Sequence, residues 1–178
     1  STLIIIRTMF GRCIFGQPGK PDYAIYVKQR NQIISAWHDI PLWANTSTSE
    51  AQPILLNFVC EVPARSFAKM EIQTDRRSNP IMQDKTRDGH LRTYKYGPMP
   101  CNYGALPQTW ESPARISPHT RCPGDGDPID VLQIGATPLD AGAVTPVKAL
   151  GVLAMIDGGE TDWKVIAIAT DDPLAGEL

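Results

Sequence analysis

Proline and glycine residues are spread along the whole of this chain, and they limit the length of any regular element it can form. The 178 residues include 16 Pro and 14 Gly, which recur throughout rather than in one tract. Proline breaks helix interiors and both residues favour turns, so short strands joined by turns are expected rather than long helices. At this length a single domain with its own core, residues 1–178, is expected.

Apolar runs of strand length lie between these turn residues. The run at residues 68–73 alternates, so Lys69 and Glu71 should lie on one face of a strand. The expected strands are residues 23–27, 54–62, 68–73, 131–134, 147–156 and 163–170. Residues 75–90 are expected to be loop, and residues 96–121 to hold no long element because five prolines interrupt them. This pattern predicts a mainly β fold, in the form of a small barrel.

The net charge is close to zero, but the charges are unevenly distributed. The formal value of −2 gives no basis for binding nucleic acid or an anionic membrane surface. Residues 62–95 hold eight Lys or Arg against four Asp or Glu, whereas residues 125–162 hold seven acidic residues against one Lys. If the fold brings these stretches together, carboxylates for cations would face basic groups for an anion. Two unrelated solvated faces would give the same counts.

Three aspartates occupy the hexapeptide Asp-Gly-Asp-Pro-Ile-Asp at residues 125–130. Carboxylates this close repel one another unless a cation holds them, and Mg²⁺ needs only a few convergent oxygen ligands because it keeps several waters. A solvated acidic turn is the alternative, since Asp, Gly and Pro are turn residues. A calcium-binding EF-hand loop is excluded, because Pro128 occupies an interior position and the central Gly and terminal Glu are absent.

A second acidic cluster lies between two apolar runs further along the chain. Asp157 ends one expected strand, and Asp162 begins the next. In extended geometry Asp162 and Lys164 share a face, which is often only a surface ion pair. Combined with residues 125–130, this cluster would instead complete a site for several metal ions.

Mixed charges also occur in the basic half of the chain. They are Glu61, Lys69, Glu71 and Arg92. A phosphoanhydride needs cationic groups for its oxygens, which Arg binds in bidentate fashion and Lys as a point charge. Taken singly, each residue is more typical of a solvated surface than of a ligand site. Tyr103, in a proline-rich loop, could present its phenol to a ligand or fill the barrel.

The cysteines and the first residues carry little chemistry. The four cysteines show neither a Cys-x-x-Cys pair nor a disulfide spacing, so reduced thiols in an intracellular protein are expected, in the cytoplasm or alternatively in the mitochondrion.

Residues 1–16 contain two Arg and no acidic residue, and they are too short to span a bilayer. They fit the remnant of an organellar targeting peptide, an irregular N-terminus, an artefact of gene prediction or an ordinary strand.

Six stretches, taken together and in order, resemble the soluble inorganic pyrophosphatases of the eukaryotic type. They are His-Asp-Ile-Pro-Leu at 38–42, Glu-Val-Pro at 61–63, Ala-Lys-Met-Glu-Ile at 68–72, Asn-Tyr-Gly-Ala-Leu-Pro-Gln-Thr-Trp-Glu at 102–111, Gly-Asp-Gly-Asp-Pro-Ile-Asp-Val at 124–131 and Asp-Gly-Gly-Glu-Thr-Asp-Trp-Lys-Val-Ile-Ala at 157–167. The resemblance implies a closed five-stranded barrel of OB type with few flanking helices. It also implies Mg²⁺-dependent hydrolysis of pyrophosphate to two phosphates, by a homodimer.

The resemblance further implies a role for each matching residue. The activating metals would be held by Asp125, Asp130 and Asp162, and the metals that arrive with substrate by Asp157 and Glu71. The general base would be Asp127. The phosphoryl groups would be bound by Lys69, Arg92, Tyr103 and Lys164, with Glu61 and Glu160 supporting the site.

The chain departs from the family pattern in two ways. The segment between Arg92 and Asn102 is shorter than in the family, and Met99 stands four residues before Tyr103, where the family carries a Tyr; Tyr94 or Tyr96 would have to replace it. The family also continues past the position of Leu178, so the sequence is expected to be truncated relative to it. The missing part would leave apolar surface exposed, which predicts lower stability and a tendency to associate. A weak or inactive homologue that serves as a binding or scaffold module is therefore the alternative function.

Overall fold

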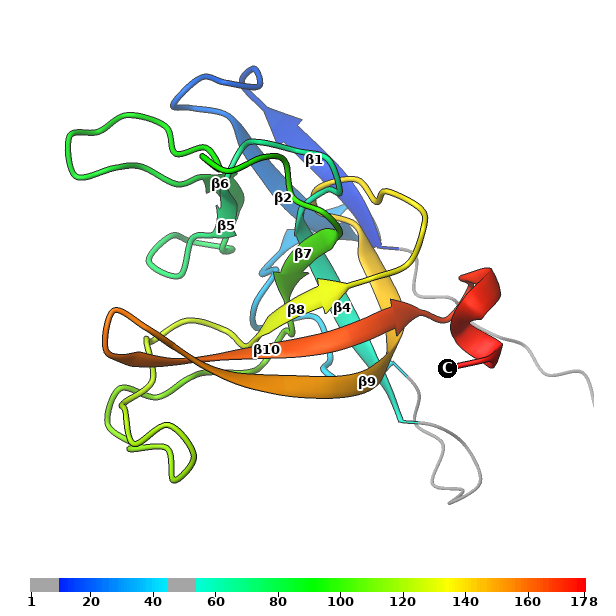
Figure 1. Ribbon diagram of the computed structural model, residues 1–178. Coiled ribbons are helices and arrows are strands. Elements are labelled where there is room, and N and C mark those ends of the chain that lie inside the picture. The colour runs from blue at the N-terminus through cyan, green and yellow to red at the C-terminus, as the bar shows by residue number, and fades with distance from the viewer. Residues whose placement is uncertain (1–9, 45–53) are drawn as a thin grey trace, which may run out of the picture.

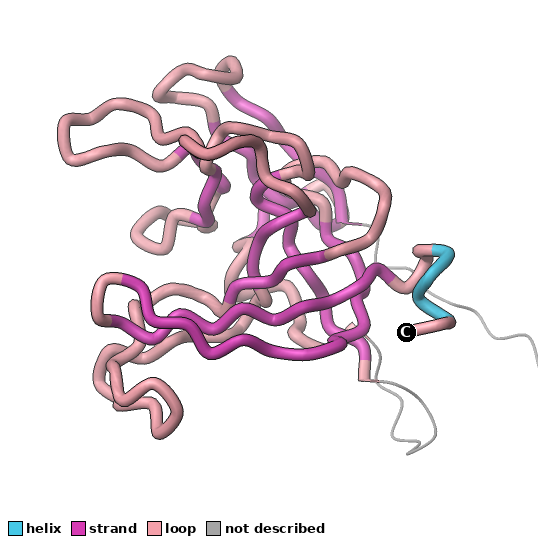
Figure 2. Tube along the Cα trace, in the orientation of Figure 1, coloured by secondary structure: helices cyan, strands magenta, loops and turns pink. Residues whose placement is uncertain are grey.

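The computed structural model describes residues 10–44 and 54–178 (Figure 1). These residues form ten strands and one short 3₁₀ helix, so the expectation of a mainly β fold is confirmed (Figure 2). The elements are β1 (Phe10–Phe15), β2 (Ala24–Gln29), β3 (Gln32–Ile34), β4 (Leu55–Val62), β5 (Met70–Ile72), β6 (Ile81–Gln83), β7 (Asn102–Ala105), β8 (Asp130–Gln133), β9 (Val144–Asp157), β10 (Glu160–Ala169) and the 3₁₀ helix η1 (Pro173–Gly176). Within these ranges no helix has the length and apolar character that a bilayer crossing requires.

Five strands close into a barrel in the order β10-β8-β7-β4-β9. β4 pairs antiparallel with both β7 and β9, and β10 pairs parallel with β8 and antiparallel with β9. The predicted closed barrel is therefore confirmed. Its parallel pair places Lys164 of β10 opposite Asp130 of β8, although 34 residues separate them in sequence.

A second sheet, in the order β1-β2-β6-β5 with β3 on β2, packs beside the barrel (Figure 1). It contains three strands that the sequence analysis did not predict, β1, β3 and β6; β6 lies within the expected loop at 75–90. β1 shows that residues 10–15 form an ordinary strand, whereas the remainder of the proposed targeting segment, residues 1–9, lies outside the described residues. At the other end of the chain η1 follows β10, with the side chain of Asp172 capping it.

Two hydrophobic clusters share strand β4. Phe58 and Cys60 belong to the cluster formed by the barrel strands, and Val59 and Val62 belong to the cluster between the barrel and the second sheet. The pairing of β4 with β7 shifts between Cys60 and Val62, so Glu61 is the extra residue of a bulge. The bulge explains why Glu61, a charged residue, lies within a strand whose two faces are both buried.

Strand β7 is placed by a buried amide and a close backbone approach. The side chain of Asn102 donates to Gln133 Oε1 (2.7 Å) and the Thr137 carbonyl (2.9 Å), and it accepts from the amides of Ala64 (3.0 Å) and Leu139 (2.8 Å). A Cβ atom at Gly104 would lie 2.0 Å from the carbonyl oxygen of Val59, so only glycine allows β7 this close to β4. These contacts fix the backbone on either side of Tyr103, which lies between the two residues in β7.

Candidate functional site

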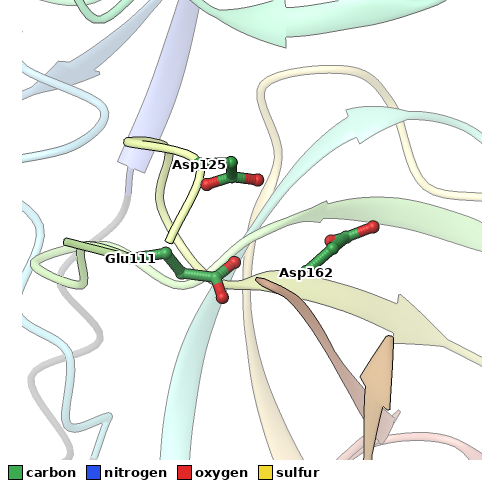
Figure 3. A group of neighbouring side chains, drawn as sticks. All are labelled: Glu111, Asp125 and Asp162. Atoms are coloured by element: carbon green, nitrogen blue, oxygen red, sulfur yellow. The ribbon is translucent and has the colours of Figure 1, made fainter. Parts of the chain in front are cut away.

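Three carboxylates from distant parts of the chain meet at one point. Ligand oxygens of Glu111, Asp125 and Asp162 all lie within 4.8 Å of one another. Figure 3 shows the three side chains converging from separate segments, with Asp162 at the start of β10. Such an arrangement is electrostatically unfavourable without a cation, because like charges are held together.

The turn that carries Asp125 is bound directly to the segment that carries Glu111. The Glu111 amide donates to the Asp127 carbonyl, and the Gly126 amide donates to the Glu111 carbonyl, both at 2.9 Å. A Cβ atom at Gly124 would lie 2.3 Å from the Glu111 carbonyl oxygen, so a glycine is required there. Gly124 and these two backbone hydrogen bonds therefore hold the segments of Asp125 and Glu111 close together.

Glu111 is the most unusual carboxylate of the group. It is 7% exposed, and its Oε1 accepts from the Trp163 amide at 3.2 Å. Its Oε2 is buried and has no hydrogen-bond partner among the described residues. Burial, together with the charges of Asp125 and Asp162, raises the pKa of Glu111 to about 7 although the Trp163 amide opposes the rise. A buried oxygen left without a donor beside two other carboxylates is what a cation-binding site presents.

Lys164 binds a second set of polar side chains, which has Asp162 in common with the first set. Its Nζ donates to the carboxylate of Asp130, to Asp162 Oδ1 at 2.5 Å and to the Tyr103 hydroxyl at 3.0 Å. Burial opposes the charge on the ammonium, but the two carboxylates outweigh it and raise the pKa of Lys164. Asp162 belongs to both sets, because it lies with Asp125 in the first and shares the ammonium group of Lys164 with Asp130 in the second. The role of these three aspartates as metal ligands stays a prediction.

Asp127 stands at the exposed edge of this cluster. Its amide donates to Asp125 Oδ1 at 2.9 Å, which fixes the turn between the two residues. Desolvation by neighbouring protein atoms, followed by the charges of Asp125, Glu71 and Asp130, raises the pKa of Asp127 to about 6. A carboxylate with a pKa near neutrality is suited to accept a proton at physiological pH.

Two of the predicted basic residues, Lys69 and Arg92, lie on neighbouring segments beside β5, where the Lys69 amide donates to the Arg92 carbonyl at 3.1 Å. Lys69 Nζ contacts the carboxylate of Glu71 and lies 3.6 Å from Asp84 Oδ2. Arg92 Nη1 binds the same oxygen of Asp84 at 2.5 Å. Glu71 raises the pKa of Asp127 and Lys69 lowers it, so these two residues of the basic stretch lie near enough to Asp127 for their charges to act on it.

Glu61 joins the barrel to the second sheet beneath the site. It is 5% exposed, and its Oε1 accepts from the Ile72 amide at 2.6 Å. Burial raises its pKa well above the usual value, and the charge of Asp130 adds to the rise. The residue therefore supports the position of β5 next to the barrel.

Two predicted residues are not brought into contact with this cluster. Asp157 and Glu160 are paired across the exposed tip of the β9–β10 hairpin (Figure 1). In the part of the chain that the structure describes, neither side chain has a hydrogen bond or ion pair with the other site residues. Their roles remain predictions.

Tyr94 and Tyr96, the two candidates to replace the phenol that the family carries at position 99, differ in their exposure. Tyr96 is fully exposed, whereas Tyr94 is half-buried against the hydrophobic cluster that also contains Met99. Burial and the charges of Glu61 and Glu71 raise the pKa of Tyr94 to about 12. The hydroxyl of Tyr94 therefore lies in the field of the site carboxylates.

Sequence reasoning assigned no role to Asp84 or Glu111, yet both are central to the geometry. Asp84 follows a three-residue strand inside a stretch expected to be loop, so its pattern gave no signal. Glu111 closes the matching stretch at 102–111, and that position was the one available signal.

Comparisons with known proteins agree with this geometry. A family profile described as inorganic pyrophosphatase matches residues 58–178. The inorganic pyrophosphatase of Yarrowia lipolytica is 47% identical over 167 residues, which cover 92% of this chain and 56% of that protein. This chain spans about half the length of the curated relatives it matches.

Solved structures extend the likeness to three dimensions. A crystal structure of type I inorganic pyrophosphatase from Toxoplasma gondii has a TM-score of 0.89 at 44% identity, covering 96% of this chain and 73% of the other. An N-terminally truncated vacuolar soluble pyrophosphatase of Trypanosoma cruzi, described as a complex with PPi, has a TM-score of 0.90 at 39% identity, covering 100% and 71%. These matches confirm that the barrel is of the predicted OB type.

Proposed function

Because this chain belongs to the inorganic pyrophosphatase family, we propose that it hydrolyses pyrophosphate to two phosphate ions with Mg²⁺ as its cofactor. The observation that carries the proposal is that Asp162 lies with Asp125 and Glu111 in one carboxylate group and also shares the ammonium group of Lys164 with Asp130. Cation-binding carboxylates and anion-binding side chains in one site are what a metal pyrophosphate complex requires.

The residues present fit a hard divalent cation. Carboxylate oxygens of Glu111, Asp125 and Asp162 lie within 4.8 Å of one another, and in the described part of the chain the buried Oε2 of Glu111 has no hydrogen-bond donor. We assign the activating ions to Asp125, Asp130 and Asp162, with Glu111 beside them. The ions that accompany substrate are assigned to Glu71 and Asp157, in keeping with the family resemblance. When bound, Mg²⁺ activates water and neutralises phosphoryl charge.

The other side chains of the site handle the substrate and the proton. Lys69 and Arg92 would bind one phosphoryl group from the second sheet, and Lys164 and Tyr103 would bind the other from the barrel. Asp127 would accept the proton of the attacking water as its oxygen bonds to phosphorus. The bridging oxygen then leaves with the second phosphate. The pKa of Asp127, raised to about 6, supports this role, because the carboxylate is ionised at neutral pH but still basic enough to take a proton.

Tyr94 is proposed to supply the phenol that is absent at position 99. Replacing Tyr94 by Phe should raise the KM for pyrophosphate about tenfold, because a hydrogen bond to a charged phosphoryl oxygen is lost. Steady-state kinetics at saturating Mg²⁺ measure this effect. Tyr96→Phe is the matched control and should leave the KM unchanged, since Tyr96 is fully exposed. Equal KM values for the Tyr94→Phe variant and the parent chain would remove Tyr94 from the site.

The function itself is tested by phosphate release from pyrophosphate with and without Mg²⁺. We expect release that depends on the metal and ends when a chelator removes it. Calorimetric titration of Mg²⁺ in the absence of substrate should show metal binding whether the chain is an active enzyme or an inactive homologue. Metal and pyrophosphate binding without phosphate release would favour the alternative, an inactive homologue acting as a binding module. Preferential competition by longer polyphosphates would instead indicate a different phosphoanhydride substrate.

We further propose a cytoplasmic homodimer. The homodimer is what the family resemblance implies, and exposed apolar side chains of β9 offer a surface for association. They are Val152, Leu153, Met155 and Ile156. Apolar side chains gathered on one exposed element are typical of a protein contact.

A further inference from the structure

A second concave site lies on the second sheet, away from the acidic cluster. It is a half-open pocket of about 760 Å³, within the size range of small-molecule sites. Its walls come from the β1–β2 hairpin, from β3, from the turn between β5 and β6 and from β6. None of its lining residues belongs to the site described above.

Two adjacent arginines line this pocket, and their charges have no protein partner. Arg76 and Arg77 are both exposed, and within the described residues neither guanidinium group forms an ion pair or donates a side-chain hydrogen bond. Guanidinium groups match the oxygens of phosphate and carboxylate bidentately. The pocket therefore offers a site for an anionic group.

The turn that carries the arginines is held in place from below. Asn79 is 5% exposed, and its side chain donates to the carbonyls of Gln73 (3.1 Å) and Thr74 (3.3 Å). Its Oδ1 accepts from the Ser35 hydroxyl at 2.6 Å. These bonds fix the turn to the rest of the sheet, so the arginines start from an ordered backbone and less entropy is lost when a ligand binds.

The opposite wall of the pocket is aromatic and apolar. The rings of Phe15 and Tyr26 meet edge to face, with centroids 5.6 Å apart, and Ile33 lies beside them at 41% exposure. Asp22 lies on the same side and supplies a hydrogen-bond acceptor. A planar ring would remove this apolar surface from water, and a carboxylate such as that of Asp22 suits a sugar hydroxyl.

We propose that this pocket binds a nucleoside monophosphate. The phosphate lies at Arg76 and Arg77, the base lies against Phe15 and Tyr26, and Asp22 accepts from the ribose. An inorganic anion would leave the aromatic wall exposed, and an uncharged ring would leave both guanidinium groups unused. A nucleotide is the chemical class that uses both walls at once.

Calorimetric titration of the intact chain with AMP, adenosine and inorganic phosphate tests the proposal. We expect AMP to bind more tightly than either fragment. The double variant Arg76→Gln/Arg77→Gln should weaken AMP binding at least about tenfold and leave adenosine unaffected, because only phosphate contacts are lost. Tyr26→Leu should weaken both AMP and adenosine. The matched control Arg115→Gln/Arg121→Gln removes the same charge from another exposed loop and should change nothing.

The result that overturns the proposal is equally specific. Absence of AMP binding to the parent chain at about 1 mM would end it. So would AMP binding that survives in the Arg76/Arg77 double variant but is lost in Arg92→Gln, because the nucleotide would then occupy the acidic site. Circular dichroism of each variant checks that the fold is retained.

Discussion

Replacing Asp127 by Asn is expected to lower the turnover of pyrophosphate by about 10²–10⁴-fold while leaving Mg²⁺ affinity nearly unchanged. The substitution removes the proposed base but keeps the shape of the side chain. The turn should survive, because it depends on backbone bonds from Glu111 and Gly126 and on the acceptor Asp125 Oδ1. Single-turnover kinetics measure the chemical step, and calorimetric titration measures Mg²⁺ binding without substrate.

Asp88→Asn is the matched control for this variant, because it removes the same negative charge from an exposed loop. It should leave both turnover and Mg²⁺ binding at the level of the parent chain. If Asp127→Asn instead turns over pyrophosphate at the parent rate, Asp127 is not the base. A loss of Mg²⁺ affinity equal to the loss of turnover would place Asp127 among the metal ligands instead.

The sequence predicted those parts of the molecule whose signal is local. The alternation at 68–73 correctly placed Lys69, just before β5, on the same side as Glu71 of β5, and the apolar runs at 54–62 and 163–170 correspond to β4 and β10. The unequal charge distribution was also informative, because Lys69 and Glu71 of the basic stretch act on the pKa of Asp127 in the acidic stretch. In each case neighbouring residues specify the property, through strand alternation or simple composition.

The remaining features depend on pairing between distant segments, which no local pattern encodes. β6 and β7 have three and four residues, and β6 is buried throughout, so neither shows alternation. Asp84 becomes a partner of Arg92 only because short segments around residues 69, 84 and 92 hydrogen-bond side by side. Glu111 becomes buried only because the glycine at position 124 allows a close backbone approach. Both residues were therefore missed for the same physical reason.

Replacing Asp130 by Asn is expected to weaken Mg²⁺ binding about tenfold or more, because the charge of the ligand set is lowered by one. The fold should survive, since the amide keeps the shape of the carboxylate and Lys164 retains its bond to Asp162. Turnover should fall at low Mg²⁺ and recover in part as the metal concentration rises, unlike the defect of Asp127→Asn. Activity measured against Mg²⁺ concentration, together with calorimetric titration, separates the two variants.

This contrast makes the assignment of metal ligands independent of the assignment of the base. Asp171→Asn, an exposed change just beyond β10, should give the Mg²⁺ dependence of the parent chain. If Asp130→Asn binds Mg²⁺ as tightly as that control, the carboxylate serves Lys164 and Tyr103 rather than a metal, as their hydrogen bonds in the structure allow. Glu111, whose Oε2 lacks any donor, would then replace Asp130 as the third ligand beside Asp125 and Asp162.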